Sequence, residues 1–121
     1  MTDHLGTELP LVVTTDATPQ AIVVYTVPPN TSGALALLLA ARDLAGNTKV
    51  WRLVRTGKNV GGIVTGVGAQ PAATIEQDAA ATAWSASLSV SGSDLVLTVV
   101  GVVGVTITWA PLVQTLILVA S

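Results

Sequence analysis

Apolar and polar residues alternate most regularly in the stretch AWSASLSVSGSD, residues 83–94. The alternation is between four apolar side chains, Trp84, Ala86, Leu88 and Val90, and four serines, Ser85, Ser87, Ser89 and Ser91. A period of two residues is typical of a β-strand with one packed face and one polar face. The SGSD that follows predicts a turn into a second strand over 95–101.

Runs rich in Val, Ile, Leu and Thr recur along the rest of the chain, separated by Gly, Pro, Asn and Asp. Such runs favour strands, and the residues between them favour turns. Short strands at this spacing predict an all-β fold, a single-domain antiparallel β-sandwich that is jelly-roll-like and has about eight strands. We expect an N-terminal arm over 1–9 and the sandwich domain over 10–121. The expected strands cover 9–16, 21–27, 34–44, 49–57, 63–67, 84–91, 95–101 and 105–109, followed by a final strand after Pro111. Pro10 lies at the start of the first strand. Residues 72–80 form either a strand or a short helical turn.

The segment ALALLLAARDL, residues 34–44, is ambiguous because Ala and Leu are good helix formers. The flanking PPNTSG and AGNT are rich in the residues that form turns between paired strands. We therefore expect a strand that pairs with 49–57, and a helix remains the alternative.

The end of the chain carries no charged residue and no histidine after Asp94. Hydropathy alone would allow a membrane span over 95–121. However, Gly101 and Gly104 lie where a hairpin would turn, threonines alternate with apolar residues, and Pro111 interrupts the run. We predict a hairpin of 95–101 with 105–109, then a last strand, placed at the core and at subunit contacts and not in a membrane.

The composition is unusually apolar for a small domain. Half of the 121 residues are hydrophobic, only 10% are charged, and the mean hydropathy is +0.69. A domain of this size cannot bury half of its residues, so we expect another protein to cover part of its surface. The net charge of −2 argues against nucleic acid as a partner, and the absence of cysteine excludes disulfides.

Few residues could support catalysis or hold a metal or cofactor. His4 is the single histidine and lies in the expected arm. The pair Glu76 and Asp78 has the chemistry of an acid/base or metal site, but a solvated acidic edge is the simpler interpretation. The stretch GKNVGG, residues 57–62, lacks the spacing of a phosphate-binding loop. The sequence therefore predicts a protein without enzymatic activity, metal or cofactor.

All positive side chains fall in one window of the sequence. If 34–44 pairs with 49–57, they gather on one region, which is either a solvated hairpin or a docking patch for an acidic partner. The candidate docking residues are Arg42, Lys49, Arg52, Arg55 and Lys58.

The three tryptophans each lie in an alternating pattern, which favours core or interface anchors. An exposed carbohydrate-binding platform is the alternative. The candidate anchors are Trp51, Trp84 and Trp109.

Four segments together resemble a pattern in tailed-bacteriophage virion proteins, namely short head-decoration proteins and domains of tail fibres. They are the TTDATP opening (Thr14–Pro19), the basic strand with its GG loop (Trp51–Gly62), the W-x-A strand (Trp84–Gly92) and the final T-I-x-W strand (Gly104–Trp109). The resemblance covers most of residues 14–110, and its motifs are those of strands and turns.

The resemblance implies a β-sandwich, commonly trimeric, without catalytic residues. It implies a capsid decoration (cement) protein on the virion surface, a homotrimer that stabilises the head by bridging major capsid proteins. The alternative is a tail-associated adhesin module that binds a host-surface glycan. Neither implies contact with nucleic acid or membrane.

Overall fold

The computed structural model describes residues 7–66 and 74–119. Within these ranges the chain forms antiparallel strands and one short 3-10 helix, η1 (Ala79–Ala81), so the prediction of an all-β antiparallel sandwich is confirmed. The strands are β1 (Thr7–Glu8), β2 (Val12–Thr14), β3 (Gln20–Thr26), β4 (Thr31–Asp43), β5 (Thr48–Val60), β6 (Ile63–Gly66), β7 (Thr74–Gln77), β8 (Ser85–Ser91), β9 (Asp94–Val100) and β10 (Ile107–Val119).

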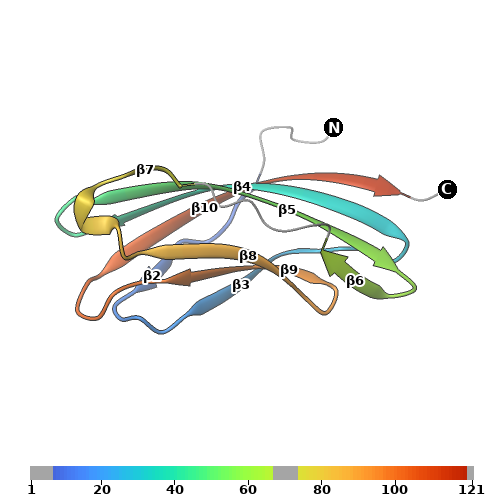
Figure 1. Cartoon of the computed structure of the whole chain (residues 1–121), viewed down its shortest axis with the longest axis horizontal. Helices are drawn as coiled ribbons and strands as arrows, with labels where there is room; N and C mark the ends of the chain where they lie inside the picture. Colours follow the sequence, from blue (N-terminus) through green and yellow to red (C-terminus); the bar gives the residue numbers. More distant parts are fainter. Residues whose placement is uncertain (1–6, 67–73, 120–121) are drawn as a thin grey trace.

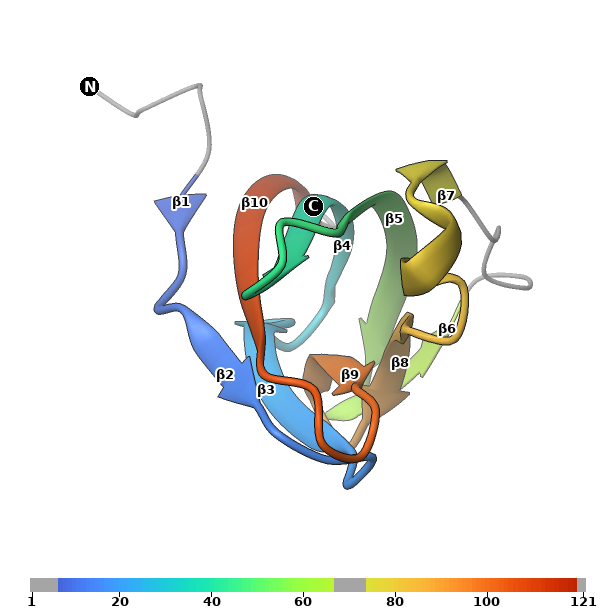
Figure 2. The ribbon, with the colours of Figure 1, turned by 90° about the vertical axis from the view of Figure 1, so that its left-hand side faces the viewer.

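The strands form a large and a small sheet. The seven-stranded sheet has the order β1-β10-β4-β5-β6, with β2 also paired to β10 and β7 also paired to β5, and the three-stranded sheet has the order β3-β9-β8. Figure 1 shows the two layers one above the other. Seen from the end in Figure 2, the large sheet arches over the small one. Each sheet therefore has one face in the shared core and one outer face.

The ambiguous segment 34–44 is a strand and not a helix. Along β4, Leu35, Leu37 and Leu39 are fully buried, and the residues between them are half-buried or exposed, which is the period of a strand. The strand begins at Thr31, so the last residues of PPNTSG belong to it and not to the turn.

The β4–β5 turn is fixed by the carboxylate of Asp43. One oxygen accepts hydrogen bonds from the backbone N–H groups of Ala45 and Asn47, and the other accepts one from the Asn47 side chain at 2.9 Å. Hydrogen bonding to Asn47 lowers the pKa of Asp43. Asp43 and Asn47 thus stabilise the turn that the AGNT stretch predicted.

The predicted hairpin between 95–101 and 105–109 is wrong. β9 pairs with β3 and β8, whereas β10 pairs with β4 and with β1 and β2, so residues 101–106 carry the chain from the small sheet to the large one. Gly101 is required at this crossing, because a Cβ there would lie 2.5 Å from Thr14 Oγ1 and 3.0 Å from the Asp16 carbonyl oxygen. Gly101 thus permits a close crossing between the layers, while Gly104, with φ of +78°, lies in a turn closed by the hydrogen bond from the Val105 N–H to the Val102 carbonyl oxygen.

Pro111 does not interrupt the last strand as predicted. β10 runs unbroken from Ile107 to Val119. The Pro111 carbonyl accepts a hydrogen bond from the Leu9 N–H at 3.2 Å. In an antiparallel strand the N and C=O of one residue point toward the same neighbour, so the Pro111 nitrogen, which has no hydrogen, also points toward Leu9. That side is the gap between β1 and β2, where regular pairing with β10 is already broken. A proline is tolerated there because little ladder hydrogen bonding is lost.

The strands observed near residues 9–16 and 72–80 are shorter than the sequence predicted. The expected strand 9–16 is regular only over Val12–Thr14, while Thr7–Glu8 of the expected arm pair with β10. Residues 72–80 contain, in their described part, both of the expected alternatives, a strand followed by a 3-10 turn. Among the described residues there is no helix long and apolar enough to cross a membrane.

Candidate docking face

The outer surface of the seven-stranded sheet is predominantly apolar. Because β4 pairs in continuous register with β5 and β10, the residues between the buried ones all face outward. Leu38 is 46% exposed and Ile75 52% exposed. We call this surface the apolar face, and its apolar members are Val13, Ala34, Ala36, Leu38, Ala40, Val50, Val54, Ile75, Ala110 and Leu112.

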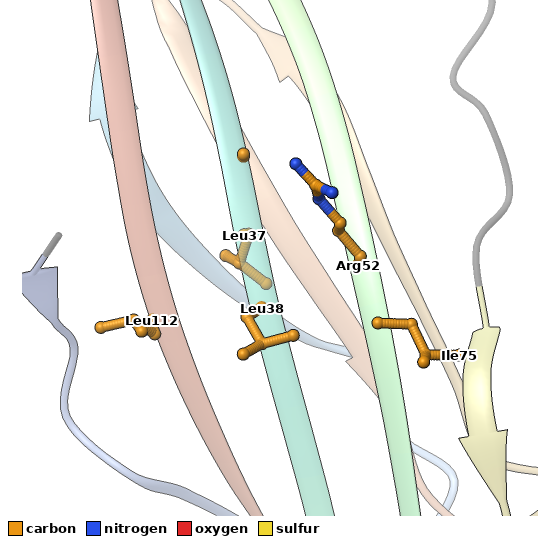
Figure 3. A pocket seen from close by; sticks show the side chains of 6 residues that line it. Leu37, Leu38, Arg52, Ile75 and Leu112 are labelled. Atoms are coloured by element: carbon orange, nitrogen blue, oxygen red, sulfur yellow. The ribbon is translucent and has the colours of Figure 1, made fainter. Parts of the chain in front are cut away.

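A shallow hollow of about 350 Å³ lies at the centre of the apolar face. Leu38 and Leu112 face each other across neighbouring strands, and Leu38 is also the register partner of Arg52. Figure 3 shows Leu38, Leu112, Arg52 and Ile75 around this hollow. Among the described residues that line it, all except Arg52 are aliphatic.

The outer surface of the three-stranded sheet has a different chemistry. The serines of β8 are exposed, and their register partners on β9 include Thr98, Val96 and Asp94. We call this surface the hydroxyl face, and its members are Ala21, Val23, Thr26, Ser85, Ser87, Ser89, Ser91, Asp94, Val96, Thr98 and Val100. The predicted alternation of β8 is confirmed, since Trp84 and Leu88 are buried while the four serines point to solvent.

The five candidate docking residues are divided between the two faces of the large sheet. Arg42, Arg52 and Lys58 are exposed and lie on the apolar face, opposite Thr108, Leu38 and Ser32. Lys49 and Arg55 lie in the inner row, opposite Ala41 and Leu35. At about 3.4 Å per residue, the three outer cations are about 13 and 20 Å apart along the strands, more than a Debye length at physiological salt. They are therefore separate charges and do not form one dense patch.

Lys49 belongs to the architecture of the sandwich. It is 6% exposed, and its ammonium donates to the carbonyl oxygens of Trp84 at 2.8 Å and Thr82 at 3.4 Å. The ammonium also lies 5.1 Å from the centre of the Trp51 ring, a cation–π contact. Burial lowers the pKa of Lys49 because the charged form loses solvation. This side chain ties β5 to the segment that leads into β8.

The three tryptophans form one cluster in the core of the chain. Trp51 and Trp109 stack with ring centres 5.4 Å apart, and Trp84 lies 6.4 Å from Trp109 in a tilted arrangement. The indole N–H of Trp109 donates to Thr14 Oγ1 at 2.9 Å. All three are at most 4% exposed, so none of them can serve as an exposed platform for a sugar ring.

The other residues singled out from the sequence have structural surroundings. The Asp78 carboxylate accepts a hydrogen bond from the Thr48 N–H at 2.8 Å, and Glu76 is exposed opposite Val50. GKNVGG covers the end of β5 and the turn into β6, and its buried Asn59 amide, on β5, donates to the Val27 carbonyl oxygen. In the part of the chain that the structure describes, no three His, Cys, Asp or Glu side chains are grouped to hold a metal. His4 lies outside the described residues.

The apolar face was not recognised from the sequence, although one signal for it is present. In the run ALALLLAA, residues 34–41, every residue is apolar. A strand with one solvated face alternates, whereas a strand covered on both faces is continuously apolar. The run thus indicated that the outer side of β4 is also made of side chains that favour burial.

Comparison with known proteins gives little further guidance. No protein-family model and no curated protein matches the chain. Among solved structures, a tailspike protein of an Acinetobacter phage aligns with 18% sequence identity and a TM-score of 0.48. The alignment covers 99% of this chain and 23% of the tailspike chain.

Proposed function

We propose that this chain is a structural virion protein of a tailed bacteriophage, and specifically a capsid decoration protein that trimerises and bridges major capsid proteins. The observation that carries the proposal is the exposed apolar face, together with the sequence pattern over residues 14–110 that resembles such proteins. The protein would act by binding and not by catalysis, at the surface of the head.

An apolar sheet face of this kind is suited to docking on a folded protein. Leu38, Val54 and Ile75 are each at least 36% exposed although they are large aliphatic residues. Removing such surface from water is favourable by about 25 cal/mol per Å², and contiguous apolar patches on soluble proteins commonly mark interaction sites. The isolated cations on the same face would fix the register of docking and disfavour incorrect partners.

Trimerisation would use other parts of the surface. A closed ring of three copies joins two different patches on each subunit, and this leaves a third surface available for the capsid. Light scattering on the purified protein would determine the oligomeric state. A monomer or a dimer at micromolar concentration would contradict the trimer.

The docking function is tested with heads assembled from the major capsid protein of the same phage. The purified protein is added, and sedimentation measures its occupancy and calorimetry the melting temperature of the heads. We expect saturable binding and a higher melting temperature, because a ligand that binds only the assembled head stabilises it. Binding to isolated tails but not to heads would support the adhesin alternative, which would require a glycan site that does not use the buried tryptophans.

A further inference from the structure

The hollow on the apolar face has the shape of a socket for one side chain. Ala36 contributes only a methyl group to its lining, while Leu38, Leu112 and Ile75 are larger side chains around it. The volume of about 350 Å³ is at the lower end of the range for ligand pockets, about 300–1,000 Å³. It therefore suits a single bulky group and not an extended ligand.

Arg52 gives this socket a charge preference. Its side chain is exposed and lines the hollow, and no ion pair joins it to another residue of the described ranges. Around it, where side chains are described, the charged residues of the apolar face are the cations Arg42 and Lys58 and the acid Glu76, and Glu8 is the register partner of Leu112. The chain as a whole carries a net charge of −2, and three of its five cations lie on this face.

The charge distribution distinguishes between two possible occupants. A twofold contact of two copies centred on the hollow would bring two Arg52 guanidinium groups together, and like charges in a desolvated contact are strongly unfavourable. A partner surface that carries carboxylates would instead bind the guanidinium through two parallel hydrogen bonds. At the hollow itself, Arg52 therefore matches an acidic partner better than it matches a second copy centred on the same point.

We propose that this hollow receives one large apolar side chain of a partner protein and that Arg52 binds an Asp or Glu carboxylate beside it. The inference rests on the proposed docking function and specifies the chemistry of its partner. An apolar anchor in a socket, with a charged pair at its edge and weaker contacts around it, is the usual arrangement of an interface hot spot. Arg42 and Lys58, farther along the strands, would contribute to the rate of encounter more than to the lifetime of the complex.

The first test uses short random peptides displayed as a library and selected on the purified protein. We expect enrichment of sequences in which a large apolar residue lies next to Asp or Glu. Their affinity should fall roughly tenfold or more in Arg52→Gln and in Ala36→Leu, which fills the hollow, and less in Arg52→Lys. Matched controls on the hydroxyl face are Ser87→Leu and Thr98→Gln, which should leave affinity unchanged.

Each other outcome of the selection would overturn the inference. These outcomes are the absence of enrichment, enrichment without acidic residues, and binding that Ala36→Leu and Arg52→Gln leave intact. A wild-type protein that self-associates, and that Ala36→Leu returns to smaller species in sedimentation, would show that the occupant is a second copy. Unfolding curves establish that each variant is folded before it is used.

The second test applies the same variants to assembled heads and separates the two proposals. If the wild-type protein binds heads and Arg52→Gln and Ala36→Leu bind equally well, the socket is wrong and the decoration function stands. If the wild-type protein fails to bind heads but the selected peptides bind at the hollow, the decoration function is wrong and the socket stands. Loss of head binding in both variants, with normal binding by Ser87→Leu, supports both.

Discussion

The two outer faces of the sandwich rest on the same core but differ sharply in chemistry. Both sheets present leucines inward, and Leu37 and Leu97 are equally inaccessible to solvent. Outward, the small sheet presents mainly serines and threonines, with Val23 and Val96 among them. The large sheet presents mainly leucine, alanine and valine, with three isolated cations and a few threonines. Folding requires only the inner rows, so the hydroxyl face shows what this chain uses where it meets water. The apolar face then requires a separate explanation, and the proposed docking function would provide one.

If one core supports both faces, removing a central core side chain should destabilise both sheets. Trp109→Ala tests this and should give the largest change in the free energy of unfolding. Trp109 is fully buried, stacks on Trp51 and donates a hydrogen bond to Thr14. We expect a loss of about 3–5 kcal/mol in the free energy of unfolding by urea. Hydrogen exchange should show amides of β4 and β9 losing protection together. Val54→Ala, on the apolar face, is the control and should change stability by less than about 1 kcal/mol. Selective loss of protection in one sheet would mean that the faces do not share a core.

Gly101→Ala tests the crossing that joins the small sheet to the large one. The added methyl group would lie against Thr14 Oγ1 and the Asp16 carbonyl oxygen, and overpacking of this kind costs about 1–3 kcal/mol. Gly104→Ala is the matched control, since a Cβ there meets nothing within 4 Å and only its φ of +78° opposes the change. Its cost should be near 1 kcal/mol. Equal stability of Gly101→Ala and wild type would contradict the close crossing.

The fold class could be predicted from sequence because period-two alternation records which residues face the core. This worked for β8, where small serines alternate with apolar residues, and for β4, where the flanking turns outweighed helix propensity. Sheet assignment could not be predicted, because Gly101 and Gly104 serve a turn or a crossing equally well and only long-range pairing distinguishes them. For the same reason the continuity of β10 through Pro111 depends on a gap between β1 and β2 that no local pattern reveals.

The candidate site was only partly accessible to the same reasoning. A single window contains all five cations, but a strand sends alternate side chains to opposite faces, so Lys49 and Arg52 separate although they are close in sequence. Register decides which face each one joins, and that depends on pairing with β4. The tryptophans were easier to interpret, because large aromatics in alternating patterns usually lie in the core.

Lys49 and Arg52 therefore provide a comparison of an inner and an outer cation on one strand. Because burial lowers the pKa of Lys49 in the folded state, the unfolded chain binds more protons between that lowered value and 10.5. Stability should then rise with pH in this interval and be lost as pH falls through the folded pKa. Measurement by urea unfolding is best kept below about pH 9.5, because burial raises the pKa of Tyr25 above 10.0 and has the opposite effect at higher pH. Lys49→Met should flatten the rise and Arg52→Met should not. The same slope in both variants would show that Lys49 is not the group responsible.

The smallest effect on stability, and the most direct test of the contrast between the faces, comes from exchanging their chemistry. Leu38→Ser places a hydroxyl on the apolar face, and Ser87→Leu places a leucine on the hydroxyl face. Both side chains point outward, so each change should alter the free energy of unfolding by only about 0.5 kcal/mol. Retention on a hydrophobic interaction column should nevertheless move in opposite directions, falling for Leu38→Ser and rising for Ser87→Leu, because retention follows exposed apolar area. If Leu38→Ser leaves retention unchanged while Ser87→Leu raises it, the apolar face is already covered in the free protein, and the surface available to a partner must be sought elsewhere on the sandwich.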